Sequence, residues 1–113
     1  MEIRQEQRDQ VIILSLVGRL DANTSKDLEE NLITLIEANN RRFIIDCAKL
    51  DYISSAGLRV LLMGAKKLKS LDGSIALASL KEHIKDIFEI AGFLSIFSIF
   101  NNAEEATGHD QHL

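Results

Sequence analysis

The chain of 113 residues contains no proline, no tryptophan and only one cysteine. Because Cys47 has no second cysteine to pair with, a small secreted scaffold held by disulfides is excluded and a reducing compartment is favoured. The N-terminus is charged from Glu2 onward and lacks the apolar core of a signal peptide. The longest apolar run, residues 11–17, is far shorter than the ~20 residues of a transmembrane helix. We therefore expect a cytoplasmic protein that does not cross a membrane.

Basic residues are fewer than acidic residues. The chain has 13 Lys and Arg residues against 17 Asp and Glu residues, which gives a formal net charge of −4. Nucleic acids and anionic membranes select basic surfaces, so neither is expected as the main partner. The hydrophobic share of 46% and the charged share of 27% are typical of one globular domain at this length.

Strands and helices alternate along most of the chain. Since proline is absent, their limits are indicated by glycine, asparagine, aspartate and serine. The predicted strands are residues 2–8, 11–17, 42–47, 74–78 and 95–100, and helical apolar stripes occupy residues 28–36, 58–68 and 84–91. Thr24 is expected to cap the first helix and Gly92 to end the third, and residues 102–107 favour one or two further helical turns.

This order predicts a single α/β domain. Two strands joined by a short connection form an opening hairpin, and the following alternation places helices over a mixed, mostly parallel sheet. We assign residues 1–108 to the domain and residues 109–113 to a flexible C-terminal tail, where fraying from residue 108 onward is expected.

Two serines, Ser54 and Ser55, lie at a strand-to-helix junction. In open α/β sheets this edge commonly engages ligands and partners. The unpaired N–H groups of a helix N-terminus would tolerate a phosphate, which adds about −1.5 to −2 charge. A serine N-cap is also a common structural device, worth about 1 kcal/mol, so the pattern alone leaves a structural and a regulatory interpretation open.

The residues around these serines resemble a known family. The string Ile53-Ser54-Ser55-Ala56-Gly57-Leu58 is similar to the element that opens a helix in the anti-sigma factor antagonists, the family that defines the STAS domain. Residues 18–24, 43–47 and 87–93 resemble further elements of that family, in the same order and spacing. The resemblance covers nearly the whole chain and implies a STAS-like fold.

The resemblance also implies a function. In the family, the serine matching Ser55 is phosphorylated by an anti-sigma factor that is also a serine kinase. The unphosphorylated protein binds that kinase and releases a sigma factor, and a PP2C-type phosphatase restores the serine. ATP and its metal belong to the kinase, so this chain is expected to be a monomeric binding protein with no cofactor and no enzymatic activity.

The same resemblance implies a partner-binding surface. Its expected members are Asp21, Asn23, Ser54, Ser55, Ala56, Gly57 and Leu58. The family's more familiar version has aspartate where this chain has Ser54, which makes Ser54 the second candidate for phosphorylation after Ser55. Asp21 is explained equally well as an acid that the helix dipole favours, whereas Asn23 is better explained as a cap and Leu58 as a core residue that could also reach the surface.

Other groups indicate little chemistry. Cys47 follows a buried strand and is expected to be a small hydrophobic residue rather than a reactive thiol. His109 and His112 are too few to indicate a metal site, and neither a carboxylate pair nor a phosphate-binding loop is present. The alternative function is a non-switching STAS subunit of a larger assembly, such as a bacterial lipid-transport complex.

Overall fold

The computed structural model describes residues 1–111, and for residues 109–111 it describes the backbone only. The elements are β1 (Glu2–Arg8), β2 (Val11–Leu20), α1 (Thr24–Glu37), β3 (Arg42–Ile53), α2 (Ser55–Ser70), β4 (Ser74–Ala78), α3 (Glu82–Ile90), β5 (Ser98–Phe100) and α4 (Ala103–Gln111). Their order is the predicted one, and the α/β fold class is confirmed.

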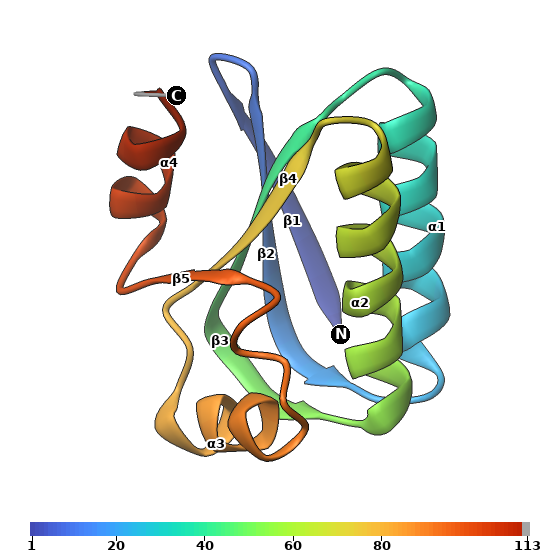
Figure 1. The fold of residues 1–113 in the computed structure, drawn as a ribbon. Helices are drawn as coiled ribbons and strands as arrows, with labels where there is room; N and C mark the ends of the chain where they lie inside the picture. The colour runs from blue at the N-terminus through green and yellow to red at the C-terminus, as the bar shows by residue number, and fades with distance from the viewer. Residues whose placement is uncertain (112–113) are drawn as a thin grey trace.

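The sheet has five strands in the order β1-β2-β3-β4-β5. β1 pairs with β2 in antiparallel orientation, and the other pairings are parallel. Helices α1 and α2 lie side by side over one face, α4 lies on the other face, and α3 lies at the end of the sheet where β3 terminates (Figure 1). The predicted mixed, mostly parallel sheet with its opening hairpin is therefore present.

Strand β2 is buried on both faces, which explains its unbroken apolar run. Ile12, Leu14 and Leu16 belong to the main core beneath α1 and α2. Val11 and Ile13 belong to a smaller core with Ala106 of α4. Since successive side chains of a strand point to opposite faces, a strand covered on both sides needs apolar residues at every position.

The central strand is longer than predicted. β3 continues to Ile53 rather than ending at Cys47, because residues 48–53 remain paired with the end of β2. Register shifts along this pairing break the regular alternation, so Leu50 and Ile53 are buried while the residues between them are exposed. The last strand is shorter than predicted and begins at Ser98 rather than Ser95.

The helical turns predicted near the C-terminus are present and form a longer helix, α4. Asn102 Oδ1 accepts a hydrogen bond from Glu105 N at 2.8 Å, and Ala106 is buried against the sheet. α4 thus runs to Gln111, into the segment assigned above to a flexible tail, and residues 112–113 lie outside the described residues. The predicted end of α3 is confirmed, since Gly92 follows its C-terminus with a φ of 77°.

Candidate functional site at the ends of β2 and β3

Two segments distant in sequence meet where β2 and β3 end. The strands are paired at Leu20 and Ile53, and Ser54 N donates to Leu20 O at 2.9 Å. The next residues, Asp21 and Ser54, therefore leave the sheet side by side and lead into α1 and α2. Each segment presents a helix N-terminus to the same edge of the sheet (Figure 1).

Asp21 supplies the cap for α1. Its Oδ1 accepts hydrogen bonds from Asn23 N and Thr24 N, both at 3.0 Å. These hydrogen bonds, the one from Thr24 first, lower the pKa of the Asp21 carboxyl because they favour its charged form. The Asp21 carboxylate is thus fixed in the turn, where its Oδ1 faces the backbone N–H groups of Asn23 and Thr24.

The expected cap at Thr24 is wrong. The Thr24 hydroxyl accepts from Asp21 N at 2.9 Å and donates to Arg19 O at 2.8 Å, so it closes the turn instead of capping the helix. Asn23 directly precedes the helix and provides no side-chain cap either. Its side chain is exposed at the rim of the site.

The two serines of the second junction differ in their environment. Ser54 is half-buried, its backbone is extended, and its Oγ accepts a hydrogen bond from Gly57 N at 3.2 Å. Ser54 is therefore the N-cap of α2. Ser55 is the first helical residue, is exposed, and among the described residues its hydroxyl makes no hydrogen bond.

The following residues pack inward. A Cβ at Gly57 would lie 2.8 Å from Leu20 Cγ and 3.0 Å from Ile53 Cγ1. The absence of a side chain at Gly57 thus lets α2 approach the ends of β2 and β3. Leu58 is only 9% exposed and belongs to the main core, while Ala56 is half-buried.

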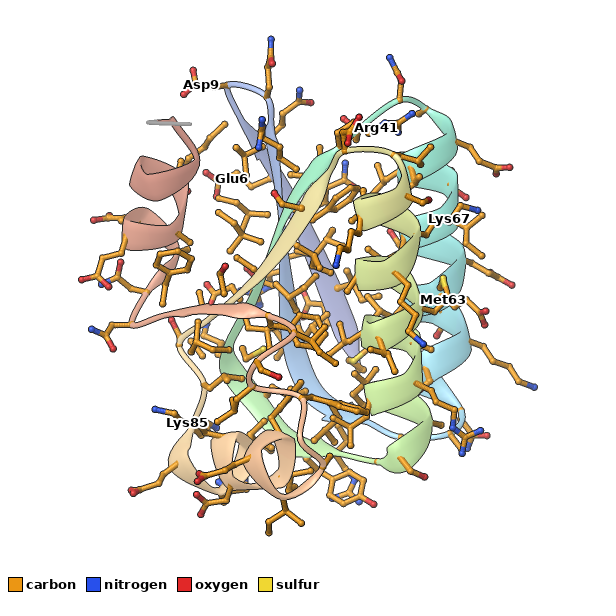
Figure 2. The ribbon with its side chains drawn as sticks, in the orientation of Figure 1. Glu6, Asp9, Arg41, Met63, Lys67 and Lys85 are labelled. Atoms are coloured by element: carbon orange, nitrogen blue, oxygen red, sulfur yellow. The ribbon has the colours of Figure 1, made fainter. Side chains whose placement is uncertain are left out.

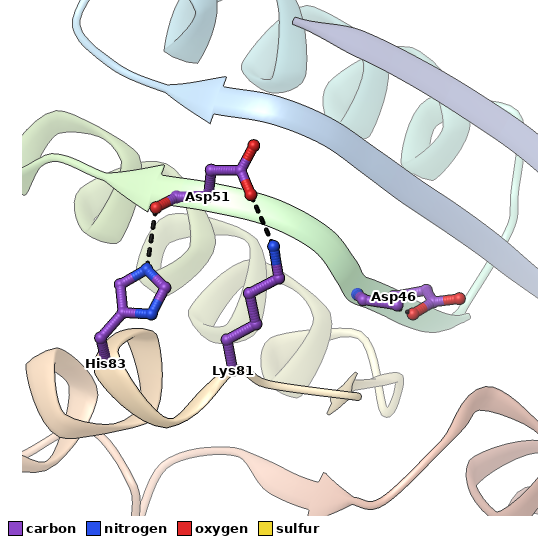
Figure 3. A network of polar contacts seen from close by, with 5 residues as sticks. Asp46, Asp51, Lys81 and His83 are labelled. Carbon is purple, nitrogen blue, oxygen red and sulfur yellow. Dashed lines mark hydrogen bonds and ion pairs between the residues drawn. The ribbon is translucent and has the colours of Figure 1, made fainter.

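A polar network that the sequence analysis missed flanks the junction (Figure 3). Lys81, just before α3, pairs with the Asp51 carboxylate at 2.5 Å, and His83 Nε2 lies 2.8 Å from Asp51 O. The hydrogen bond and charge of Lys81 lower the pKa of Asp51. Asp51, the acid nearest to Ser55 in sequence, is therefore paired with a cation from another loop.

Arg19 and Tyr52 form a second contact at this edge. They are paired in register on β2 and β3, and the Arg19 guanidinium lies 4.1 Å from the centre of the Tyr52 ring. This is a cation–π contact. The strand register could have predicted this contact between Arg19 and Tyr52. It could not be inferred from the sequence because the predicted strand ended at Cys47 instead of Ile53.

Other reactive groups lie away from this edge or are inert. Cys47 is fully buried, and burial raises the pKa of its thiol to about 12, so the predicted role as a small hydrophobic residue is confirmed. Within residues 1–111, no three His, Cys, Asp or Glu side chains are grouped as metal ligands would be. The possible pair of His109 and His112 extends outside the described residues. No helix in this part of the chain combines the length and apolarity needed to cross a membrane.

Comparison with known proteins shows the family. Residues 2–106 match the STAS domain model, and the chain belongs to the STAS domain family. A Bordetella bronchiseptica protein provisionally named as the anti-sigma factor antagonist BtrV is 41% identical over 106 residues, covering 94% of this chain and 91% of its own. The anti-sigma-B factor antagonist of Bacillus subtilis is 30% identical over 105 residues, covering 92% and 93% of the two chains.

The fold is shared with the anti-sigma factor antagonist SpoIIAA. Its unphosphorylated structure has a TM-score of 0.80 at 17% identity, with coverage of 99% of this chain and 100% of that chain. The phosphorylated form from Bacillus has a TM-score of 0.79 at 18% identity, with coverage of 96% and 98%. The predicted resemblance to anti-sigma factor antagonists of the STAS family is confirmed.

Proposed function

We propose that this protein is an anti-sigma factor antagonist whose binding is controlled by phosphorylation of Ser55. In its unphosphorylated form it binds an anti-sigma factor that is also a serine kinase, and a sigma factor is released. A PP2C-type phosphatase reverses the modification. The protein acts in the cytoplasm as a monomer, and the residues around Ser55, including Asp21 and Asn23, contact the partner.

The observation that carries this proposal is the difference between the two adjacent hydroxyls. Ser54 is half-buried and its Oγ is engaged with Gly57 N at the helix cap, so a kinase would have to open the cap to reach this hydroxyl. Ser55 is exposed and its hydroxyl has no hydrogen bond among the described residues, so its modification leaves the fold intact. This difference favours Ser55 over Ser54, the second candidate.

Physical chemistry supplies a mechanism for the switch. A neutral hydroxyl at Ser55 can be buried in an interface at little cost. A phosphate dianion buried without a cationic partner costs several kcal/mol, more than the ~1.4 kcal/mol that corresponds to a tenfold loss of affinity. Phosphorylation would therefore weaken binding without any conformational change in this chain. The names of the relatives support the antagonist function, and the phosphorylated structure of SpoIIAA shows that a protein of this fold carries a phosphate.

The first test locates the modification. The purified protein is incubated with a serine-kinase anti-sigma factor from the same genome, ATP and Mg²⁺, and the phosphate is mapped by mass spectrometry. We expect one phosphate on Ser55, and none on the Ser55→Ala protein. Phosphate at Ser54 in that variant would move the switch by one residue, and a chain never modified at either serine would contradict the mechanism.

The second test measures binding. We expect Ser55→Asp to weaken the affinity for the anti-sigma factor at least tenfold, while Ser70→Asp, at the other end of α2, leaves it unchanged. A Ser55→Asp protein that binds a partner as well as the wild type would instead indicate a fixed STAS subunit of a larger assembly.

A further inference from the structure

A groove between α1 and α2 begins beside Ser55. It has a volume of about 630 Å³ and is open to solvent along its length. Its residues come from both helices and from the turn before α1: Ala22, Ser25, Lys26, Glu29, Ala56, Arg59, Val60, Leu62, Met63 and Lys66. Ala56 and Ala22 directly adjoin Ser55 and Asp21, so the groove continues the surface proposed above to bind the partner. Met63, labelled in Figure 2, lies on the side of α2 that faces α1.

The groove has an apolar floor and basic residues along its margins. Val60, Leu62 and Met63 are buried or half-buried along the floor. The exposed charged residues on the margins are Lys26, Arg59 and Lys66 against Glu29 alone. The margins of the groove therefore carry a net positive charge, whereas the whole chain carries a net charge of −4.

These features specify the occupant. An amphipathic helix places apolar side chains along one stripe and fits an open groove of this kind. From Ser55 to Lys66 is eleven residues of helix, or ~16 Å at 1.5 Å per residue, which matches about three turns of a docked helix. Acidic residues flanking its apolar stripe would pair with the three cations.

We propose that the α1–α2 groove binds an acidic amphipathic helix of the anti-sigma factor, with Lys26 and Arg59 as its charge-recognition residues. This proposal rests on the proposed function and adds a second contact area to the Ser55 region. Because Arg59 lies four residues after Ser55 on the same helix, a phosphate on Ser55 would compete with the acidic helix for that guanidinium. Phosphorylation would then weaken both contact areas at once.

The test compares charge reversals inside and outside the groove. The affinity of the purified anti-sigma factor is measured by isothermal titration calorimetry for wild type, for Lys26→Glu with Arg59→Glu, and for Lys69→Glu. Lys69 lies on the same helix outside the groove and lines the neighbouring depression toward residues 95–98, which shares only Leu62 and Lys66 with the groove, so its reversal serves as the control. We expect at least a tenfold loss for the double variant and less than a twofold change for the control. The wild-type affinity should also fall steeply with added salt.

The possible outcomes separate the two proposals. A double variant that binds as the wild type does, in a protein whose binding is lost with Ser55→Asp, would overturn the groove proposal and leave the function standing. A wild type that binds no anti-sigma factor would overturn both. If sedimentation equilibrium shows that the double variant instead loses self-association, the groove binds a second copy and the proposal is wrong.

A second measurement does not depend on charge reversal. A photo-crosslinking benzoylphenylalanine placed at Met63 should capture the anti-sigma factor, and mass spectrometry should map the link to a helical segment with more acidic than basic residues. Thermal unfolding near the wild-type temperature confirms that each variant is folded. A link to a basic or extended segment would contradict the stated chemistry of the occupant.

Discussion

The two helix N-termini at the edge of the sheet both carry a pair of polar side chains, but these side chains differ in their hydrogen bonding. At the β2–α1 junction the Asp21 carboxylate and the Thr24 hydroxyl are both engaged in closing the turn. At the β3–α2 junction one hydroxyl, that of Ser54, holds the cap, and the next hydroxyl, that of Ser55, is free of hydrogen bonds among the described residues. The comparison teaches that only one of two neighbouring hydroxyls holds the helix cap, so the proposed phosphorylation of Ser55 would leave the cap at Ser54 in place.

The largest effect at these junctions is expected from Gly57→Ala. The added Cβ would come within 3.0 Å of atoms of Leu20 and Ile53, both of them buried. Helix propensity improves by roughly 0.5–1 kcal/mol, but overpacking costs roughly 1–3 kcal/mol. We expect a net loss of about 1–2 kcal/mol in the free energy of unfolding, measured by urea denaturation.

The matched control for this substitution is Gly108→Ala in α4. Apart from its chain neighbours and the backbone of its own helix, no atom of the described residues lies within 4 Å of the position where that Cβ would be added. We expect Gly108→Ala to be neutral or stabilising. Equal losses in both variants would mean that the close approach at Gly57 is not what sets its cost.

The next largest effect is expected from Asp21→Ala, because two backbone N–H groups lose their acceptor. We expect the midpoint of thermal unfolding to fall by several degrees at neutral pH. Since the pKa of Asp21 is lowered in the folded state, its contribution to stability is present above the ordinary value of 3.8 and is lost as the pH falls through the folded-state pKa. The difference between wild type and variant should therefore shrink below about pH 4. A difference that stays constant as the pH falls below about 4 would contradict the role of the charged carboxylate.

A smaller effect separates the adjacent serines. Ser54→Ala removes the acceptor of Gly57 N and should lower the free energy of unfolding by about 1 kcal/mol. Ser55→Ala should change it by less than about 0.5 kcal/mol, as is usual for an exposed position with no special contact. Denaturation of the two variants in parallel tests the comparison directly. The reverse order would mean that Ser55, and not Ser54, holds the helix.

Much of this architecture was predictable because it depends on local periodicity. The α/β order follows from the apolar stripes and the β-branched runs, and the Ser54–Ser55 junction from its sequence pattern. The cap of α1 was misassigned because Thr24 and Asp27 have the spacing of a capping box. Asp21 and Thr24 have the same three-residue spacing one turn earlier, and these are the two residues that bond to each other. An Asp-x-x-Thr pattern at the end of a strand was the signal that could have identified it.

Features set by tertiary contacts could not be predicted in this way. The full length of β3 depends on bulged pairing with β2, which removes the alternation that marks a strand. Lys81 and His83 reach Asp51 across about thirty residues of chain, and nothing local in the sequence links them. The α1–α2 groove depends on how the two helices approach each other, and its existence cannot be read from either helix alone.

The smallest expected effect concerns the charge environment of Ser55 after modification. With phosphoserine incorporated at this position, the helix N-terminus and Arg59, four residues later, should both favour the dianion and hold the second pKa of the phosphate below its usual value of ~6. Arg59→Ala should raise that pKa by a few tenths, and the increase should diminish at high salt because both groups are exposed. A ³¹P NMR titration measures this, with Arg41→Ala, at the opposite end of the sheet, as the control. An identical pKa in wild type and Arg59→Ala would show that the phosphate does not reach Arg59, and competition between the phosphate and an acidic partner helix would then lose its physical basis.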